Sequence, residues 1–145
     1  MYVSMRRFLL ICLLFNSLLQ ITAVGQDKCL LPLHEGESIR YDTYIEMPQA
    51  YISGICILLH DEHVIKGSLI NEFGITAIDF IYYPKKEKVK LYGVFSAMDK
   101  WYIRRVLRKD LAQLFRCLKQ GETQYINKRR NITYNFKPVD NDTTQ

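Results

Sequence analysis

Hydrophobic and polar residues alternate with a period of two over residues 39–47, which is typical of a β-strand, and four further strand-like runs follow up to residue 95. The pattern predicts five strands, at residues 39–47, 51–59, 64–71, 75–83 and 89–95. Short polar or proline-containing turns separate them. Turns of this length join antiparallel neighbours, whereas parallel strands need a longer crossover. We therefore expect an antiparallel meander.

The period then changes from two to between three and four, which indicates one amphipathic helix over residues 96–120. Ser96, followed three residues later by Asp99, resembles an N-terminal cap, and Gly121 ends the helix. The side chains expected to face the sheet are Trp101, Ile103, Leu107, Leu111, Leu114 and Leu118. Residues 123–127 and 132–136 predict a final hairpin, and residues 138–145 a flexible tail.

Two of the predicted strands, 51–59 and 75–83, are apolar on both faces. A sheet with one wet face would alternate cleanly, so these strands must be covered on both sides. One helix covers one side only. The fold class that follows is α+β: a curved antiparallel sheet, or incomplete barrel, of five to seven strands with one long helix. Gly54, Gly67 and Gly93 lie inside strands and are the expected points of curvature.

The first 25 residues have the three parts of a secretion signal. Arg6 and Arg7 precede an apolar stretch over residues 8–19, and Ala23 and Gly25 are small residues before a cut at Gln26. The stretch is shorter than the ~20 residues of a membrane-spanning helix. The residues before Cys12 and Cys29 fit a lipid-attachment site poorly. We expect residues 26–145 to form one exported domain, in the periplasm or at the outer-membrane periphery.

Three cysteines follow the signal: Cys29, Cys56 and Cys117. An odd number allows at most one internal disulfide, and no C-x-x-C motif is present. Cys56 lies in an apolar strand and is expected to be a core residue. Cys29 and Cys117 are the more plausible pair if a disulfide forms.

The sequence gives little support for catalysis. Residues 60–63, His-Asp-Glu-His, have metal-ligating side chains, but their spacing fits a hairpin turn rather than a helical metal site. Asp79 interrupts an apolar strand and is expected to pair with an arginine of the helix. No nucleophile motif or phosphate-binding loop is present. We therefore expect no enzyme activity, no metal and no cofactor.

Charge and aromatic residues provide two candidate surfaces. The chain has 20 basic and 15 acidic residues, with seven basic residues between positions 100 and 119. Such a run is more often a solvated helix face; the functional alternative is docking on an anionic membrane or an acidic protein. Nucleic acid is disfavoured by the secretion signal. The docking candidates are Arg104, Arg105, Arg108 and Lys109. The candidates for an apolar groove are Phe80, Tyr82, Tyr92 and Trp101.

Short motifs at residues 52–56, 66–74, 79–80 and 99–103 resemble small envelope proteins of Gram-negative bacteria. Those in turn are similar to the outer-membrane lipoprotein carrier and receptor superfamily. The resemblance implies an incomplete barrel that encloses an apolar cavity for acyl chains, and no catalytic residues. The expected function is binding of a lipid or an acylated protein. The alternative is a secreted structural or interaction module with a self-filled core that docks a protein partner.

Overall fold

The computed structural model describes residues 28–139; the expected secretion signal and the residues after Val139 lie outside this range. Seven antiparallel strands form one sheet in the order β5-β4-β3-β2-β1-β7-β6. The elements are β1 (Ser38–Met47), β2 (Ala50–Asp61), β3 (Val64–Asn71), β4 (Thr76–Tyr83), β5 (Lys88–Val94), η1 (Ser96–Met98), α2 (Trp101–Lys119), β6 (Gln124–Asn127) and β7 (Ile132–Pro138).

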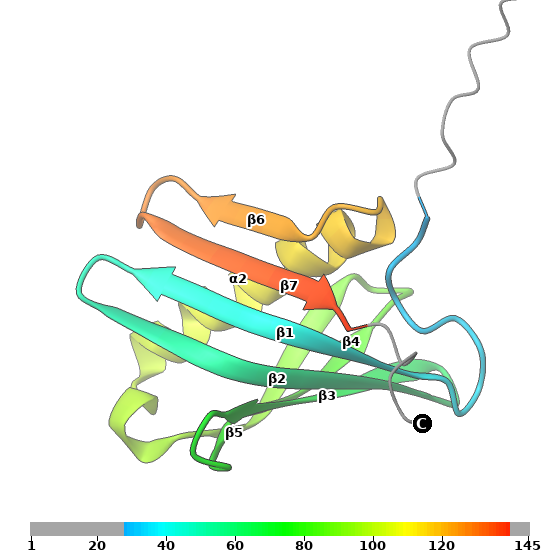
Figure 1. The fold of residues 1–145 in the computed structure, drawn as a ribbon, viewed down its shortest axis with the longest axis horizontal. Helices are drawn as coiled ribbons and strands as arrows, with labels where there is room; N and C mark the ends of the chain where they lie inside the picture. Colours follow the sequence, from blue (N-terminus) through cyan, green and yellow to red (C-terminus); the bar gives the residue numbers. More distant parts are fainter. Residues whose placement is uncertain (1–27, 140–145) are drawn as a thin grey trace, which may run out of the picture.

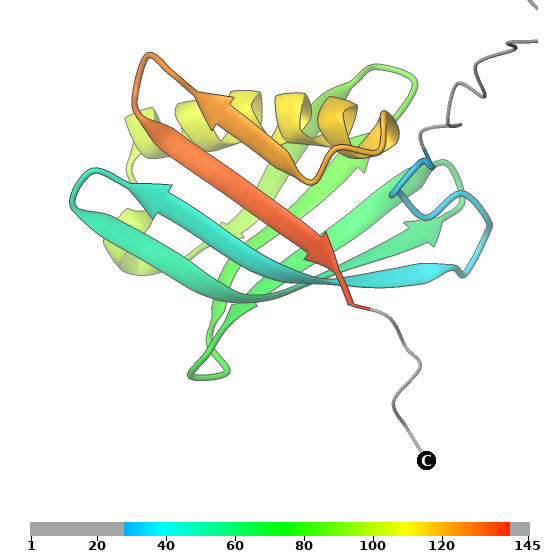
Figure 2. The same cartoon turned by 45° about the horizontal axis from the view of Figure 1, so that its top comes forward.

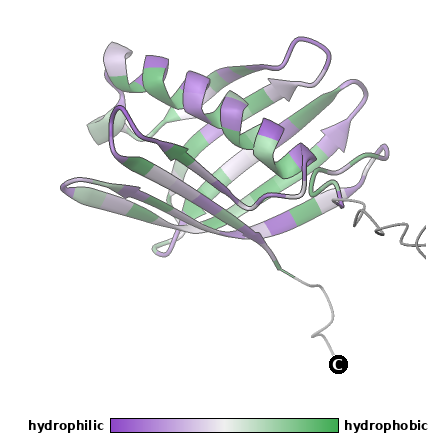
Figure 3. Ribbon diagram, turned by 90° about the horizontal axis from the view of Figure 1, so that it is seen from above, coloured by the Kyte–Doolittle hydropathy of each residue, from purple (hydrophilic) through white to green (hydrophobic). Residues whose placement is uncertain are grey.

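The sheet curls into a half-barrel, and α2 crosses its open side (Figures 1 and 2). The helix contacts β5 and β6, which are the two edge strands. Its apolar stripe faces into the half-barrel, where Leu111, Leu114 and Leu118 are fully buried. In Figure 3 hydrophobic and hydrophilic residues alternate along α2, as expected of an amphipathic helix. The predicted fold class is therefore confirmed.

Aromatic side chains form the part of the core that fixes α2 to the sheet. Phe115 of α2 stacks on Tyr82 of β4, with 4.4 Å between ring centroids, and lies 5.7 Å from the ring of Phe80. All three side chains are buried. Each such side chain contributes ~1.5–3 kcal/mol when it is removed from water. These contacts hold the helix against the C-terminal half of β4.

Glycines allow close approach at two of the predicted points of curvature. A Cβ atom on Gly54 would lie 2.0 Å from the carbonyl oxygen of Ile70, next to a register shift in β3. A Cβ atom on Gly67 would lie 2.2 Å from the Phe80 ring, which fills the space below β3. Both positions therefore require glycine for steric reasons.

β1 and β7 are neighbours in the sheet although they come from opposite ends of the described chain. Tyr41 of β1 is opposite Pro138 of β7, so Pro138 belongs to a strand rather than to the expected tail. The Tyr41 hydroxyl donates to the carbonyl of Leu30 in the segment before β1. The Leu30 N–H in turn donates to the carbonyl of Leu118, at 2.9 Å. The lead-in segment is thereby tied to both the sheet and the helix.

The predicted start of the helix is wrong. Residues 96–98 form a separate 3₁₀ turn, and α2 begins at Trp101 after an extended Lys100. Ser96 makes no side-chain cap, and the Asp99 carboxylate instead accepts hydrogen bonds from Arg104. Because the helix starts late, Trp101 points to solvent and is 76% exposed, where we expected it to face the sheet.

Candidate functional site

The four expected groove residues do not form one groove, although Phe80 and Tyr92 both line an open pocket of about 390 Å³. Phe80 and Tyr82 are buried under α2 and pack on Phe115. Tyr92 lies exposed on β5, where the Lys90 ammonium is 5.0 Å from its ring centroid. Trp101 is exposed at the start of α2. Between residues 28 and 139 no single cavity is lined by all four.

An apolar cleft of about 440 Å³ opens at one end of the half-barrel. It lies between the β1–β2 hairpin, η1, the first two turns of α2 and the β6–β7 hairpin. These segments all lie at the end of the molecule that is on the left in Figure 1. The lining residues are Ile45, Met47, Pro48, Ala50, Tyr51, Ile52, Met98, Tyr102, Ile103, Val106, Leu107, Arg130, Ile132 and Tyr134.

The cleft runs from solvent to the core. Ile45, Leu107 and Tyr134 are buried, while Tyr51 and Tyr102 are exposed. A volume of this size lies within the usual range for small-ligand sites, ~300–1,000 Å³. The arrangement suits a narrow apolar group that enters from one end.

Arg130 is the one charged residue in the lining of this cleft. Its backbone N–H donates to Asn127 at 3.2 Å, which orders the β6–β7 turn, and its side chain is in no ion pair among residues 28–139. A guanidinium at the mouth of an apolar cleft can bind a carboxylate or phosphate through two parallel hydrogen bonds. The geometry therefore fits an amphiphile with an apolar chain and an anionic end.

Asp110 supports one wall of the cleft from behind. This carboxylate is 3% exposed and accepts hydrogen bonds from the Tyr134 hydroxyl at 2.8 Å and from the Asn127 amide at 2.9 Å. The contacts connect α2 to the β6–β7 hairpin. Burial, with the nearby negative charge of Asp110, raises the pKa of Tyr134 far above its usual value. The tyrosine ring that lines the cleft is thus held as a neutral hydrogen-bond donor.

The expected docking residues of α2 differ in whether they form an ion pair within the described chain. Arg104 pairs with Asp99, and its Nη2 lies 3.2 Å from Asp99 Oδ2. Arg105, Arg108 and Lys109 line a shallow groove of about 670 Å³ beside β5 and β6, with Glu87 and Lys88 at its edge. Arg105, Arg108 and Lys109 form no ion pair within the described chain. They remain available to an anionic surface.

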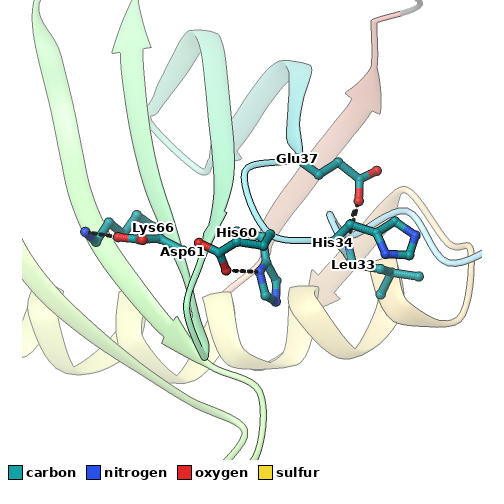
Figure 4. Close-up of polar contacts among 7 residues, drawn as sticks. Leu33, His34, Glu37, His60, Asp61 and Lys66 are labelled. Carbon is teal, nitrogen blue, oxygen red and sulfur yellow. Dashed lines mark hydrogen bonds and ion pairs between the residues drawn. The ribbon is translucent and has the colours of Figure 1, made fainter.

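Residues 60–63 form the end of β2 and a turn, as the sequence indicated. Asp61 pairs with Lys66 of β3 (Figure 4). Glu35 Oε2 lies 3.5 Å from His60 Nδ1. Glu37 binds the backbone N–H groups of Leu33 and His34, which lowers the pKa of its carboxyl group. Residues 28–139 contain no group of three or more side chains suited to hold a metal.

The expected pairing of Asp79 with a helix arginine is wrong. Asp79 accepts a hydrogen bond from Ser68 at 2.6 Å. Its neighbours Ile78 and Phe80 are buried and face α2, so the alternation of the strand turns Asp79 to the outer face, away from the helix. The Asp79 side chain is therefore partly covered by neighbouring strands of the sheet and not by α2.

The sequence left open whether a disulfide forms, with Cys29 and Cys117 as the pair if one does; in the structure all three described cysteines are free. Cys29 and Cys117 are half-buried, and Cys56 is fully buried. Burial raises the pKa of Cys56 and of Cys117, which disfavours the thiolate form at both positions. The core position expected for Cys56 is confirmed.

Most residues of the cleft were missed in the sequence. Val106 and Tyr102 lie outside the predicted apolar stripe, and Met47, Ile52 and Arg130 belong to turns or strand ends. One signal was present: residues 51–59 carry more apolar side chains than one buried face needs.

Comparison of the chain with protein-family models, with curated proteins and with solved structures gives no match. Within residues 28–139, no helix combines the length and the apolar character needed to cross a membrane.

Proposed function

We propose that this chain is a non-enzymatic cell-envelope protein that binds the acyl chain of a lipid or an acylated protein in the cleft. The observation that supports it best is the apolar lining, which is continuous from Tyr102 at the mouth to Ile45 in the core, with Arg130 beside it. Each buried CH₂ group of an acyl chain contributes ~0.8 kcal/mol. Eight such groups would contribute about 6 kcal/mol before the cost of ordering the chain.

Filling the cleft tests this proposal directly. Val106 is half-buried and lines the cleft, so the indole of Val106→Trp would occupy the space that an acyl chain needs. We expect its affinity for a fluorescent fatty acid to fall about tenfold or more, a loss of roughly 1.4 kcal/mol. Titration with the probe below its micelle concentration measures this.

The matched control is Gln113→Trp, an exposed position on the same helix that does not line the cleft. It should bind the probe as the unmodified protein does. Equal binding by both variants would contradict the assignment of the cleft. Absence of probe binding, together with no lipid in native mass spectra of gently purified protein, would favour the alternative of an interaction module that docks a protein partner.

The basic side of α2 is proposed to attract the protein to an anionic membrane. A basic side chain near such a surface contributes on the order of 1 kcal/mol, and the attraction fades beyond ~8 Å at physiological salt. The variant replaces Arg104, Arg105, Arg108 and Lys109 by Gln. We expect most of its salt-sensitive co-sedimentation with anionic vesicles to be lost, although Arg104 contributes less because of Asp99.

A charge-matched control replaces four exposed lysines outside α2 by Gln: Lys28, Lys85, Lys86 and Lys137. If this control loses as much binding as the helix variant, only net charge matters. The helix would then be a solvated surface without a docking role.

A further inference from the structure

Large apolar side chains are exposed at the cleft end of the half-barrel: Tyr51 and Tyr102 line the cleft, and Phe73, Ile75 and Phe95 line a neighbouring pocket. Six of them come from turns and element ends at that end of the half-barrel, the left end in Figure 1. They are Tyr51, Phe73, Ile75, Phe95, Trp101 and Tyr102. Phe73 and Trp101 are 78% and 76% exposed. Aromatic residues gathered in this way are typical of surfaces that meet a protein or a membrane.

The β3–β4 turn holds Phe73 outward in a fixed position. The Asn71 side chain accepts hydrogen bonds from the N–H groups of Phe73 at 3.0 Å and Ile75 at 2.9 Å. Gly74 supplies the positive φ of 76° that the turn requires. Because the backbone of this turn is already ordered, insertion of the Phe73 side chain into a partner costs less conformational entropy than insertion from a disordered loop.

Basic side chains flank the aromatic ones. Lys100 precedes Trp101, and Lys128, Arg129 and Arg130 form the β6–β7 turn at the same end. All four are exposed and form no ion pair in the described part of the chain. Asp99 is engaged by Arg104, which leaves Glu46 and Glu72 as the unpaired acids nearby. The end of the molecule is therefore basic as well as apolar.

From these features we infer that the cleft end docks on an anionic lipid bilayer. Phe73, Phe95 and Trp101 insert at the level of the lipid headgroups, and the basic side chains bind the phosphates. Two like-charged ends of this kind would repel each other, which disfavours a second copy of the chain as the occupant. The inference rests on the proposed function in one respect, since it makes the bilayer the source of the acyl chain that enters the cleft.

Trp101 is the one tryptophan of the chain and reports on this end directly. With vesicles of phosphatidylglycerol and phosphatidylcholine we expect a blue shift of its emission, and quenching by lipids brominated in the upper acyl chain. Pure phosphatidylcholine vesicles should give about tenfold weaker binding, because the headgroup attraction is lost. Co-sedimentation without any change in Trp101 emission would overturn the inference, because the protein would then dock through another face.

The double variant Phe73→Ser/Phe95→Ser keeps the reporter and leaves the lining of the cleft unchanged. We expect it to bind anionic vesicles about tenfold more weakly. The matched control is Leu33→Ser, a 59% exposed apolar residue in the lead-in segment, which should bind as before. If the double variant has a lowered melting temperature, vesicle binding is measured instead with the single variant Phe73→Ser, which removes only an exposed turn side chain. Unchanged vesicle binding by folded variants would also overturn the inference.

The two proposals fail in different ways. The double variant should still bind the monomeric fluorescent fatty acid, while Val106→Trp should still dock on vesicles. If the protein docks on vesicles but binds no fatty acid, the docking surface is supported and the proposed function of the cleft is overturned. If the protein binds fatty acid but Trp101 does not respond to vesicles, the cleft function is supported and docking on a membrane is overturned. Binding to an acidic protein would then identify the other kind of partner.

Discussion

Gly54→Ala should unfold a large fraction of the molecules or lower the free energy of unfolding by about 3 kcal/mol. The added methyl group would lie 2.0 Å from the Ile70 carbonyl oxygen and 2.8 Å from the Asn71 Cα atom. Both are backbone atoms of β3, so the clash is relieved only by separating β2 from β3 in the middle of the sheet. At an open strand position the same change would stabilise the protein by roughly 0.5–1 kcal/mol. Urea denaturation of both proteins measures the sign and the size of this change in the free energy of unfolding.

Gly93→Ala is the appropriate control for this result. There the nearest atom to the added methyl group is the Asp79 Oδ2 atom at 3.3 Å, which belongs to a side chain that can shift. We expect a change within about 1 kcal/mol. If Gly54→Ala is as stable as the unmodified protein and Gly93→Ala, the close approach of β2 to β3 at Gly54 is wrong.

Alkaline pH should destabilise the protein steeply. Burial raises the pKa values of the Tyr41 and Tyr134 hydroxyls and of the Cys56 thiol in the folded state. The unfolded chain releases these protons near their usual pKa values, about 8.5 for Cys and 10 for Tyr, while the folded protein retains them. The contribution of these groups is therefore fully present below pH ~8.5 and falls as pH rises above it.

Each of the three groups lowers the free energy of unfolding by up to about 1.4 kcal/mol per pH unit once the unfolded chain is ionised. Together the three groups should lower the free energy of unfolding by about 4 kcal/mol per pH unit near pH 11. The total free energy of unfolding of a domain is typically 5–15 kcal/mol. Urea midpoints between pH 8 and 11 measure the slope. Tyr41→Phe and Cys56→Ala should each flatten it, whereas Phe136→Leu, a buried change without a titrating group, should lower stability at an unchanged slope.

The strands were predicted to within a residue or two in most cases because their signals are local. The alternation along β1 and the polar turn after Asp61 are visible in the sequence, and the structure places β1 at Ser38–Met47. The helix stripe of Leu107, Leu111 and Leu114 was predicted for the same reason. Each of these features depends on residues close together in the chain.

The start of the helix depends on competition for one carboxylate. Asp99 could cap a helix that begins at Ser96 or pair with Arg104, and the two arrangements use similar residue types. The structure takes the second, which shifts the helix start by five residues and turns Trp101 to solvent. The side chain that we placed in a groove thereby becomes part of an exposed surface.

The cleft could not be predicted because curvature decides which residues meet. Ile52, Val106 and Ile132 are far apart in sequence and converge only when the sheet curls and the β6–β7 hairpin adds to β1. The sequence offered Gly54, Gly67 and Gly93 as points of curvature, but it did not indicate how far the sheet curls. A strand that is apolar on both faces showed that something must cover it, without showing which segment does so.

The pairing of β1 with β7 has a consequence for the order in which the protein can be completed on the ribosome. Strands β1 to β5 are hairpin neighbours and can pair as soon as each has been made, whereas Tyr41 must wait for Pro138, almost at the end of the chain. Contacts between such distant residues form slowly. Until then the outer edge of β1 has unpaired backbone N–H and C=O groups that can bind another nascent chain. A chain that ends before residue 132 lacks all of β7 and keeps this unpaired edge permanently, so loss of the last 14 residues should make the domain prone to aggregate through β1.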